Sequence, residues 1–382
     1  MTTSPPLRAH YGRFLRGDRV LLTGHSHQAW PDCARDATIE AFDDAALHVD
    51  DKWSLAFTAA DAVREAVAAR LNAKASRVAL APNTHELVAR FLSALPLARR
   101  PKLVTTAGEF HTIHRQLRRL AEEGVAVTFV AAQPADTLAE RLLAAAGEDA
   151  AAVLASAVLF ETSERVPHLG ALTAAAKERG TEVLLDAYHA FNVAPFDAGE
   201  APGAFVVGGG YKYAQWGEGA CFMVVPEGCA LRPVYTGWFA DFAHLADRRT
   251  GAPVTYGDRP ADRFAGSTYD PVSHYRARAV ARFFDAQGLD VTALRAISLR
   301  QTGRLIDALD GLDLATPRAP ERRAGFVAVR VADAGAVVAS LRAEGVFVDA
   351  RGDLVRLGPA PYLTDDELDR GADALRRAAQ RP

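Results

Sequence analysis

The chain of 382 residues has little cysteine. Its three cysteines, Cys33, Cys221 and Cys229, lie far apart and form no Cys-x-x-Cys motif. The sequence therefore indicates neither a disulfide framework nor a zinc site, and it fits a reducing compartment. Residues 1–6 lack the basic and apolar pattern of a signal peptide, and the longest apolar run, residues 150–160, is too short to cross a bilayer. We predict a cytoplasmic protein with no membrane partner.

The chain also lacks an excess of positive charge. It has 44 basic and 47 acidic residues, a formal net charge of −3, and only short basic pieces such as residues 115–119. Nucleic-acid affinity depends largely on clustered positive charge, so we expect no nucleic-acid partner. Apolar residues make up 49% of the chain and charged residues 24%, which is ordinary for a globular protein with a substantial core. At this length, one large and one smaller domain is the default expectation.

Short apolar segments alternate with helical patterns through the middle of the chain. The predicted strands cover residues 78–81, 102–106, 125–130, 151–158, 182–186, 204–207 and 220–225. The predicted helices cover residues 84–95, a stretch ending near 123, residues 137–146 and residues 169–179. Strands separated by helices of this length imply βαβ crossovers, so the pattern predicts an α/β fold with a mostly parallel sheet covered on both faces.

The last third of the chain has a different pattern. Two long helical stretches after Pro271 precede a strand at 325–331, a helix, two short strands and a final helix. The final helix begins with a capping box at residues 364–367, Thr-Asp-Asp-Glu. We predict a large domain at 50–260, with an irregular insertion at 240–257. Residues 1–49 and 261–382 are then expected to form a smaller α+β domain.

Two residues at strand ends carry the chemical signal. Asp186 closes the predicted strand 182–186, and Lys212 follows the strand 204–207 and three glycines at 208–210. Ligands of open α/β folds bind at the carboxyl ends of parallel strands. A lysine there can form a Schiff base with the aldehyde of pyridoxal phosphate, while an aspartate keeps the pyridine nitrogen protonated. Taken alone, each residue would be interpreted as an ordinary buried or surface charge; their combination predicts a pyridoxal phosphate site.

Other residues fit such a cofactor. Asn83 and Thr84 lie at a strand-to-helix turn, where free backbone N–H groups attract phosphate, although either could simply be a helix N-cap. Phe110 follows the strand 102–106 and could stack on the pyridine ring. His111 and His114 lack a third ligand, so a metal site is not indicated. We interpret the glycines at 208–210 as letting the backbone approach the cofactor beside Lys212.

Several motifs together resemble the kynureninases, which belong to the class V aminotransferase group of fold-type I pyridoxal phosphate enzymes. The motifs are DAYH at 186–189, YKY at 211–213, GWF at 237–239 and VRLGPAPY at 355–362, with GHS at 24–26 and WP at 30–31 near the start. The resemblance covers nearly the whole chain. It implies a fold-type I fold, a homodimer with the site at the subunit interface, and cleavage of L-kynurenine to anthranilate and L-alanine.

The resemblance also implies roles for individual residues. Lys212 would carry the cofactor, with Asp186 on its pyridine nitrogen and Tyr211 as a possible proton carrier. The remaining cofactor contacts would come from His189, Phe110, Asn83, Thr84, Tyr211, Trp238 and Thr268. The substrate contacts would come from Arg356, which would bind the α-carboxylate, and from His48 and Ser26.

Three differences from the kynureninase pattern leave the identity of the substrate undecided. Thr268 stands where kynureninases have an asparagine, and it resembles a phosphate-binding threonine of cysteine desulfurases. His48 matches the family histidine only loosely, because its spacing to Trp53 differs. Residues 318–329 contain no cysteine, which argues against a desulfurase. The alternative is another class V enzyme, such as an aminotransferase, a β-lyase or a biosynthetic enzyme, acting on a different amino acid.

Overall fold

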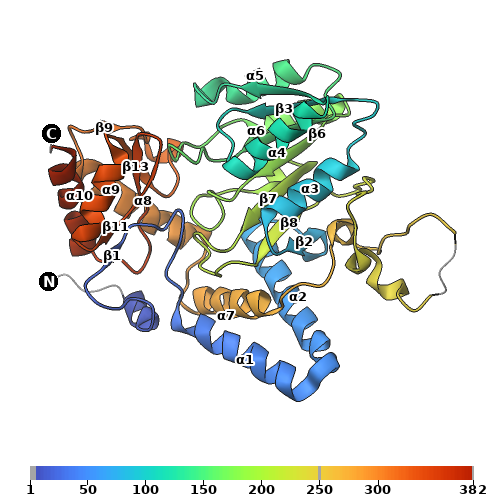
Figure 1. Cartoon of the computed structure of the whole chain (residues 1–382), viewed down its shortest axis with the longest axis horizontal. Coiled ribbons are helices and arrows are strands. Elements are labelled where there is room, and N and C mark those ends of the chain that lie inside the picture. Colours follow the sequence, from blue (N-terminus) through green and yellow to red (C-terminus); the bar gives the residue numbers. More distant parts are fainter. Residues whose placement is uncertain (1–5, 248–250, 381–382) are drawn as a thin grey trace.

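The computed structural model describes residues 6–247 and 251–380. Its larger sheet has seven strands in the order β2-β8-β7-β6-β5-β3-β4 (Figure 1). These strands are β2 (Val78–Ala81), β3 (Lys102–Thr106), β4 (Ala126–Val130), β5 (Ala152–Ser156), β6 (Glu182–Asp186), β7 (Ala204–Gly209) and β8 (Cys221–Val224). Strands β3 to β7 run parallel to one another, and β8 runs antiparallel to β7 and β2 on either side of it. The predicted α/β fold with a mostly parallel sheet is confirmed.

Helices cover both faces of this sheet, because successive side chains of a buried strand point to opposite faces. Leu184 of β6 joins one apolar cluster, and its neighbours Val183 and Leu185 join the other. The first cluster contains side chains of α3 and α4, and the second contains side chains of α5 and α6 (Figure 1). These helices are α3 (Thr84–Ala94), α4 (His111–Glu122), α5 (Leu138–Ala146) and α6 (Leu169–Glu178).

A smaller antiparallel sheet, in the order β12-β13-β10-β9, lies at the other end of the molecule (Figure 1). Its strands are β9 (Asp313–Leu314), β10 (Val327–Arg330), β12 (Asp349–Arg351) and β13 (Leu354–Leu357). Helices α8 (Val291–Ala308) and α9 (Ala334–Ala343) pack on it, and α10 (Asp365–Ala379) packs on these two helices. The predicted capping box of α10 is present, since Thr364 accepts a hydrogen bond from the Glu367 N–H and the Glu367 side chain accepts one from the Thr364 N–H.

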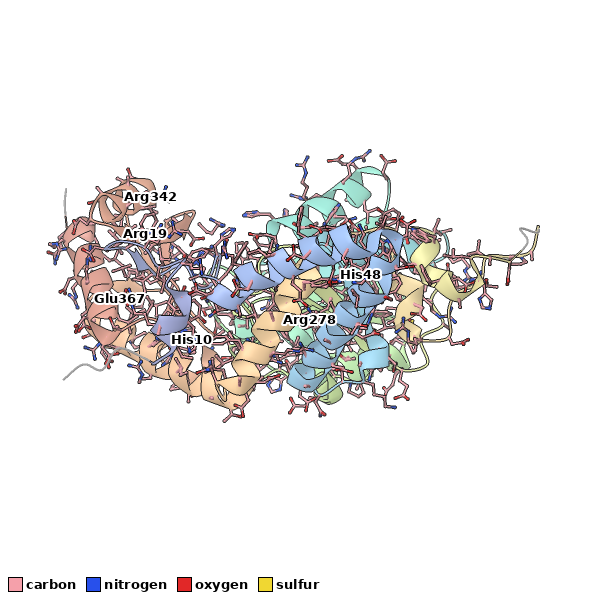
Figure 2. All side chains as sticks on the ribbon, turned by 90° about the horizontal axis from the view of Figure 1, so that it is seen from below. His10, Arg19, His48, Arg278, Arg342 and Glu367 are labelled. Carbon is pink, nitrogen blue, oxygen red and sulfur yellow. The ribbon has the colours of Figure 1, made fainter. Side chains whose placement is uncertain are left out.

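The amino-terminal segment contacts both parts of the molecule. Strand β1 (Val20–Leu21) pairs with β11 (Val346–Phe347) beside the smaller sheet. Helix α1 (Asp32–His48) instead packs on α2 (Lys52–Leu71) and α7 (Val272–Ala286), as Figure 2 shows from below. The ion pair between Arg278 of α7 and Glu40 of α1, at 2.6 Å, joins two of these helices. The domain division given above stays a prediction.

Two expected features fall partly outside the described residues. Of the insertion predicted at 240–257, residues 238–244 form a 3-10 helix, residues 251–257 are irregular, and residues 248–250 are not described. Residues 1–5, part of the segment in which we found no signal pattern, are not described either. Among the helices of the described chain, none combines the length and apolar character that crossing a bilayer requires.

Candidate active site

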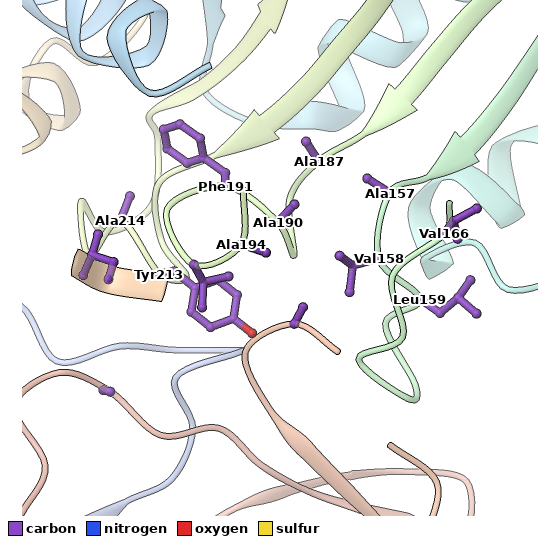
Figure 3. Packing of buried hydrophobic residues seen from close by; sticks show 14 of the residues in the cluster. Ala157, Val158, Leu159, Val166, Ala187, Ala190, Phe191, Ala194, Tyr213 and Ala214 are labelled. Carbon is purple, nitrogen blue, oxygen red and sulfur yellow. The ribbon is translucent and has the colours of Figure 1, made fainter. Parts of the chain in front are cut away.

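The loops that follow β6 and β7 build the centre of the site. Asp186 is the last residue of β6 and is in register with Val207 of β7, while Lys212 lies three residues beyond the end of β7. Because β6 and β7 are parallel, both residues lie at one edge of the sheet. Figure 3 shows the segments after β5 and β6 meeting there, with Tyr213 directed toward the smaller sheet.

The three glycines at 208–210 serve protein packing. A Cβ atom on Gly208 would collide with Phe222, one on Gly209 with Tyr188 and Cys221, and one on Gly210 with Trp216. The approach of this backbone to the cofactor beside Lys212 stays a prediction. Large side chains of the protein itself fill the space that a Cβ atom would need.

Lys212 lies in an enclosed, largely aromatic environment. Of the five lysines in the chain it is the only buried one, at 4% exposure. Its Nζ lies 2.8 Å from His189 Nε2. It also lies 5.3 Å from the ring centre of Phe110 and 4.7 Å from that of Tyr188. An ammonium ion loses hydration here, so the chemistry of this amine differs from that of a surface lysine.

Burial changes the protonation of this cluster. It lowers the pKa of Lys212 to about 7, an effect that the negative charge of Asp186 opposes. Burial, followed by the positive charge of Lys212, lowers the pKa of His189 well below its usual value, so the imidazole is neutral at pH 7. A neutral imidazole beside Lys212 offers a lone pair to the amine without adding charge.

A second carboxyl group lies beside Asp186. Burial raises the pKa of Asp186, while the Tyr188 N–H, which donates to Oδ1 at 2.8 Å, and the charge of Lys212 lower it. Glu109, at 2% exposure, accepts hydrogen bonds from the backbone N–H of Ser156 at 2.6 Å and from its hydroxyl at 2.8 Å. Burial, and next the charge of Asp186, raise the pKa of Glu109 to about 8. At neutral pH Glu109 is therefore mostly a neutral acid.

Arg356 reaches this region from the smaller sheet, in a tightly held position. Asp349 accepts from its Nε at 2.9 Å and from its Nη2 at 2.5 Å, and the carbonyl oxygen of Phe160 accepts from Nη1 at 2.5 Å. Asp349 also lies 2.7 Å from Nε2 of His25, a fully buried residue just after β1. Burial lowers the pKa of His25 to about 4, so this imidazole is neutral. The guanidinium of Arg356 is fixed before any ligand arrives.

These residues fit pyridoxal phosphate. The cofactor requires an amine of low pKa, a carboxylate for its ring nitrogen and an aromatic face for its ring, and Lys212, Asp186 and Phe110 provide these groups at one sheet edge. The Asp186 residue keeps some accessible surface although protein atoms surround its carboxyl group. Nearby, His25 Nδ1 and the Tyr213 hydroxyl are buried and have no hydrogen-bond partner within residues 6–247 and 251–380.

Solved structures of pyridoxal phosphate enzymes share this fold. The cystine C–S lyase C-DES, in complex with its product cysteine persulfide, superimposes with a TM-score of 0.82 at 16% identity, over 95% of this chain and 98% of that one. The apo cysteine desulfurase of Thermococcus onnurineus superimposes with a TM-score of 0.81 at 18% identity, over 100% and 99% of the two chains. At these identities the likeness establishes the fold.

Sequence comparison finds kynureninases. Residues 294–375 match the family described as the kynureninase C-terminal domain. The kynureninase of Deinococcus radiodurans is 29% identical over 94% of this chain and 90% of its own length. That of Salinispora tropica is 33% identical over 61% of this chain, and the match spans 57% of that protein.

The chain is similar to kynureninases over nearly its whole length. It is therefore an enzyme of the fold-type I group and uses pyridoxal 5'-phosphate. The structure brings together Lys212, Asp186, His189 and Phe110. Tyr211 lies beside them, since its ring centre is 5.7 Å from Lys212 Nζ. Arg356, which lies within the matched residues 294–375, is close enough for its charge to act on Lys212.

Other family-implied residues lie apart from Lys212 within this chain. Trp238 is 43% exposed and stacks on Phe239 with ring centres 4.5 Å apart. Thr268 is exposed and lines a separate cavity of about 470 Å³ that Phe239 and Pro82 also border. Their roles toward the cofactor stay predictions, and the predicted dimer would be needed to bring them to a site.

The structure gives hydrogen bonds for the residues of the turn before α3 and for the predicted substrate contact Ser26. The Asn83 side chain accepts from the Glu86 N–H at 2.9 Å and so acts as the N-cap, while the Thr84 N–H is directed at Cys221. Ser26 donates to the carbonyl oxygen of Thr23, one residue from buried His25.

The predicted substrate contact His48 is exposed at the end of α1. Figure 2 shows it well away from Glu367 and Arg342 of the C-terminal part. Its role in substrate binding stays a prediction.

Sequence reasoning missed Glu109, Asp349 and Arg351. Glu109 directly precedes Phe110 and binds Ser156. Ser156 is paired with Asp186 on the neighbouring strand, which is why Glu109 lies beside Asp186. Asp349 and Arg351 lie on β12, which pairs with the strand β13 that carries Arg356. The pairing of their strand with the one that carries Arg356 is the signal that could have identified Asp349 and Arg351.

Proposed function

We propose that the protein hydrolyses the Cβ–Cγ bond of L-kynurenine or 3-hydroxykynurenine, which gives anthranilate or its 3-hydroxy derivative and L-alanine. In this reaction water adds to the γ-carbonyl carbon and the Cβ–Cγ bond breaks. The carbonyl carbon leaves as a carboxylic acid, and Cβ takes up a proton to become the alanine methyl group. One observation carries the proposal: the buried Lys212–Asp186 pair lies with an arginine from a domain that matches kynureninases.

Lys212 is suited to move protons at the α-carbon. When bound, the cofactor supplies a ring that accepts the negative charge left on that carbon. With a pKa of about 7, roughly half of the Lys212 amine is unprotonated at neutral pH. It can therefore accept the α-proton and donate it again, whereas an ordinary lysine would remain charged. His189, neutral and 2.8 Å away, orients the amine.

Asp186 and Glu109 form a buried carboxyl pair. Asp186 would hold the proton on the cofactor nitrogen, and the Tyr188 N–H fixes its position at 2.8 Å. Glu109 keeps its proton near neutral pH, so it adds no second negative charge beside Asp186. Phe110 provides the face on which a flat ring can stack.

Tyr211 is suited to donate a proton in the later steps. Burial raises its pKa to about 12, so the hydroxyl stays protonated across the working range. The ring lies 5.7 Å from Lys212 Nζ. We assign it the proton that the β-carbon takes up after bond cleavage.

Product analysis tests the proposal. The cofactor-loaded protein is incubated with L-kynurenine and with 3-hydroxykynurenine, and the aromatic product is followed by fluorescence and alanine by amino-acid analysis. We expect equal amounts of aromatic acid and alanine, none with Lys212→Ala, and unchanged turnover with Lys177→Ala, a matched change at an exposed lysine. Formation of a keto acid instead, or no turnover of either kynurenine, would reject the proposed reaction.

A second candidate is chemistry at the α-carbon without carbon–carbon cleavage. The isopenicillin N epimerase of Streptomyces clavuligerus is 27% identical over 82% of both chains. Lys212 and Asp186 would serve such a reaction equally well, because both reactions begin with loss of the α-proton. Exchange of the α-hydrogen for deuterium without anthranilate formation would favour this candidate.

The homodimer belongs to the same proposal. Apolar side chains are exposed in one segment, among them Val234 at 82%, Tyr235 at 52% and Trp238 at 43%. Together with Thr268 they would be covered by a second copy. Light scattering of the purified protein measures its mass, and a monomer would contradict this part. The cytoplasmic location stays a prediction.

A further inference from the structure

A buried arginine in the C-terminal part of the molecule has no carboxylate partner. Arg295 lies in the second turn of α8 (Figure 1) and is 9% exposed. Its Nη2 donates to the carbonyl oxygen of Pro320 at 2.6 Å and to that of Arg323 at 2.9 Å. It forms no ion pair with a carboxylate of residues 6–247 and 251–380. Its positive charge is therefore buried without a counter-ion.

Two neighbouring guanidinium groups add to this positive charge. Arg323 is 4% exposed and donates to the Thr302 hydroxyl at 3.1 Å and to backbone carbonyl oxygens. Half-buried Arg165 donates to two backbone carbonyl oxygens, at 3.0 and 3.2 Å. Burial, followed by the charges of Arg165 and Arg323, lowers the pKa of Arg295 to about 10. All three side chains stay charged at neutral pH, so the cluster holds three positive charges.

The nearest carboxylates do not neutralise Arg295. Asp307 and Glu321 raise the pKa of Arg323, but neither forms an ion pair with it in the described chain. The charges that act on Arg295 are both positive. Burying a charge costs free energy unless a partner of opposite charge offsets it, so this cluster needs an anion from outside the chain.

The cluster also has buried donors without acceptors. Nη1 of Arg295 and the hydroxyl of Ser298 are buried and make no hydrogen bond within the part of the chain that the structure describes. Ser298 is 6% exposed and lies three residues after Arg295, so the two share one face of α8. Together they offer two N–H groups and one O–H group. A water molecule could accept such bonds without balancing the charge, whereas a phosphate ion does both.

The cluster lies close to the surface and apart from the reaction centre. The carbonyl oxygens that bind Arg295 and Arg165 include those of Pro320 and Glu321, which are exposed residues. The main charges that act on Lys212 come from other residues. A small anion can therefore approach this cluster without passing through the cofactor site.

We propose that Arg295 and Ser298 bind a small oxyanion of the phosphate class. Arg165 and Arg323 add the positive charge that holds it. The same donors suit free phosphate and the phosphate group of a larger metabolite. Because Arg295 joins α8 to residues 320–323, a bound anion stabilises this junction. The site lies outside the proposed reaction centre, and its occupancy does not depend on which amino acid is the substrate.

Calorimetric titration of inorganic phosphate into the cofactor-loaded protein tests this inference, because the cofactor then fills its own phosphate site. Chloride holds the ionic strength constant. We expect one phosphate per chain. Arg295→Gln should weaken binding by about 10- to 100-fold and Ser298→Ala by about 10-fold, since hydrogen bonds to charged groups are the strong ones. Arg295→Lys keeps the charge and should retain part of the affinity.

A second ligand identifies the source of the phosphate group. Glycerol phosphate is titrated under the same conditions. Binding as tight as that of phosphate supports a site for a phosphorylated metabolite, and binding of phosphate alone supports a site for the free ion.

Control variants separate binding from folding. Arg300→Gln removes an exposed arginine of the same helix, bound to Asp365 at 2.5 Å, and should leave phosphate binding unchanged. The Ser298 hydroxyl has no partner in the described chain, so Ser298→Ala should melt with wild type in chloride and below it in phosphate. Absence of phosphate binding by wild type, or equal binding by wild type and Ser298→Ala, would overturn the inference.

Discussion

Replacing Asp349 by asparagine removes the carboxylate that holds Arg356. Arg356 is 2% exposed, so the change leaves a buried guanidinium with a single amide oxygen in place of two charged contacts. Breaking a buried ion pair from one side costs about 3–5 kcal/mol. Because asparagine keeps one acceptor, we expect a loss near the lower end, about 3 kcal/mol in the free energy of unfolding.

The expected shift in melting temperature follows from the size of the chain. An unfolding entropy of about 2.1 cal/mol/K per residue gives roughly 0.8 kcal/mol/K for 382 residues. A loss of about 3 kcal/mol then lowers the midpoint by about 4 °C. Calorimetry of the cofactor-free protein measures this shift without any contribution from ligand binding.

A double-mutant cycle isolates the pair. Arg356→Met alone should destabilise the protein because Asp349 loses its partner, while Arg356→Met with Asp349→Asn should be less destabilising than the sum of the two single changes. The reasoning is refuted if Asp349→Asn costs less than about 1 kcal/mol, or if the two changes are simply additive.

The pH dependence gives an independent check on the same pair. Burial alone would raise the pKa of Asp349, but its hydrogen bond with His25 and the contacts with Arg356 hold it well below its usual value. The stabilisation is therefore complete above the pKa of an unfolded aspartate, about 4, and is lost as the pH falls below it. We expect the stability difference between wild type and Asp349→Asn to be constant from pH 8 to about 5 and to shrink in more acidic solution.

Three further predictions concern stability of the cofactor-free protein in urea. Folded Glu109 keeps its proton up to about pH 8, whereas glutamate in the unfolded chain loses it near pH 4.5. The free energy of unfolding of wild type should therefore fall between these pH values relative to that of Glu109→Gln. Parallel plots of this free energy against pH for the two proteins would contradict the prediction. Folded Lys212 releases its proton near pH 7, whereas lysine in the unfolded chain releases it near pH 10.5. The free energy of unfolding of wild type should therefore rise between these pH values relative to that of Lys212→Met. A difference between the two proteins that does not change with pH would count against the low pKa. Gly358→Ala places a Cβ atom 2.7 Å from the His25 backbone nitrogen and should cost about 2 kcal/mol. Gly303→Ala lies inside helix α8, where the new Cβ atom would make only an ordinary contact with Arg323 Nη2 at 3.7 Å, and should stabilise by about 0.5–1 kcal/mol. Equal effects of the two changes would refute this contrast.

The sequence predicted the centre of the site because its signals are local. Asp186 and Lys212 each follow a short apolar run, and strands of that kind end at one edge of a parallel sheet. Phe110 follows the same rule after β3. The chemistry could be assigned from residue types and strand ends without any distance being known.

The contacts around Arg356 could not be predicted in this way. His25 and Asp349 are separated by 324 residues and meet only because β1 pairs with β11 beside the smaller sheet. Strands of two residues, such as these, leave no periodic pattern in the sequence. The shared use of Asp349 by two arginines therefore becomes visible only in three dimensions.

Two other differences have simple physical reasons. Helix α1 was not assigned from the sequence, because the residues that it buries are the small Ala34, Ala37 and Ala41, which give a weak apolar stripe. The packing role of the glycines at 208–210 was not foreseen, because glycine signals a close approach without identifying what approaches. In the structure aromatic side chains occupy that space.

The central claim is that Lys212 carries the cofactor. Borohydride reduction of the cofactor-loaded protein followed by peptide mass spectrometry measures this directly, because it fixes a pyridoxyl group on the lysine that holds the aldehyde. The chain has five lysines, at positions 52, 74, 102, 177 and 212. The account predicts the added mass on the peptide that contains Lys212 alone. The added mass on one of the other four lysines, with Lys212 unmodified, would contradict it.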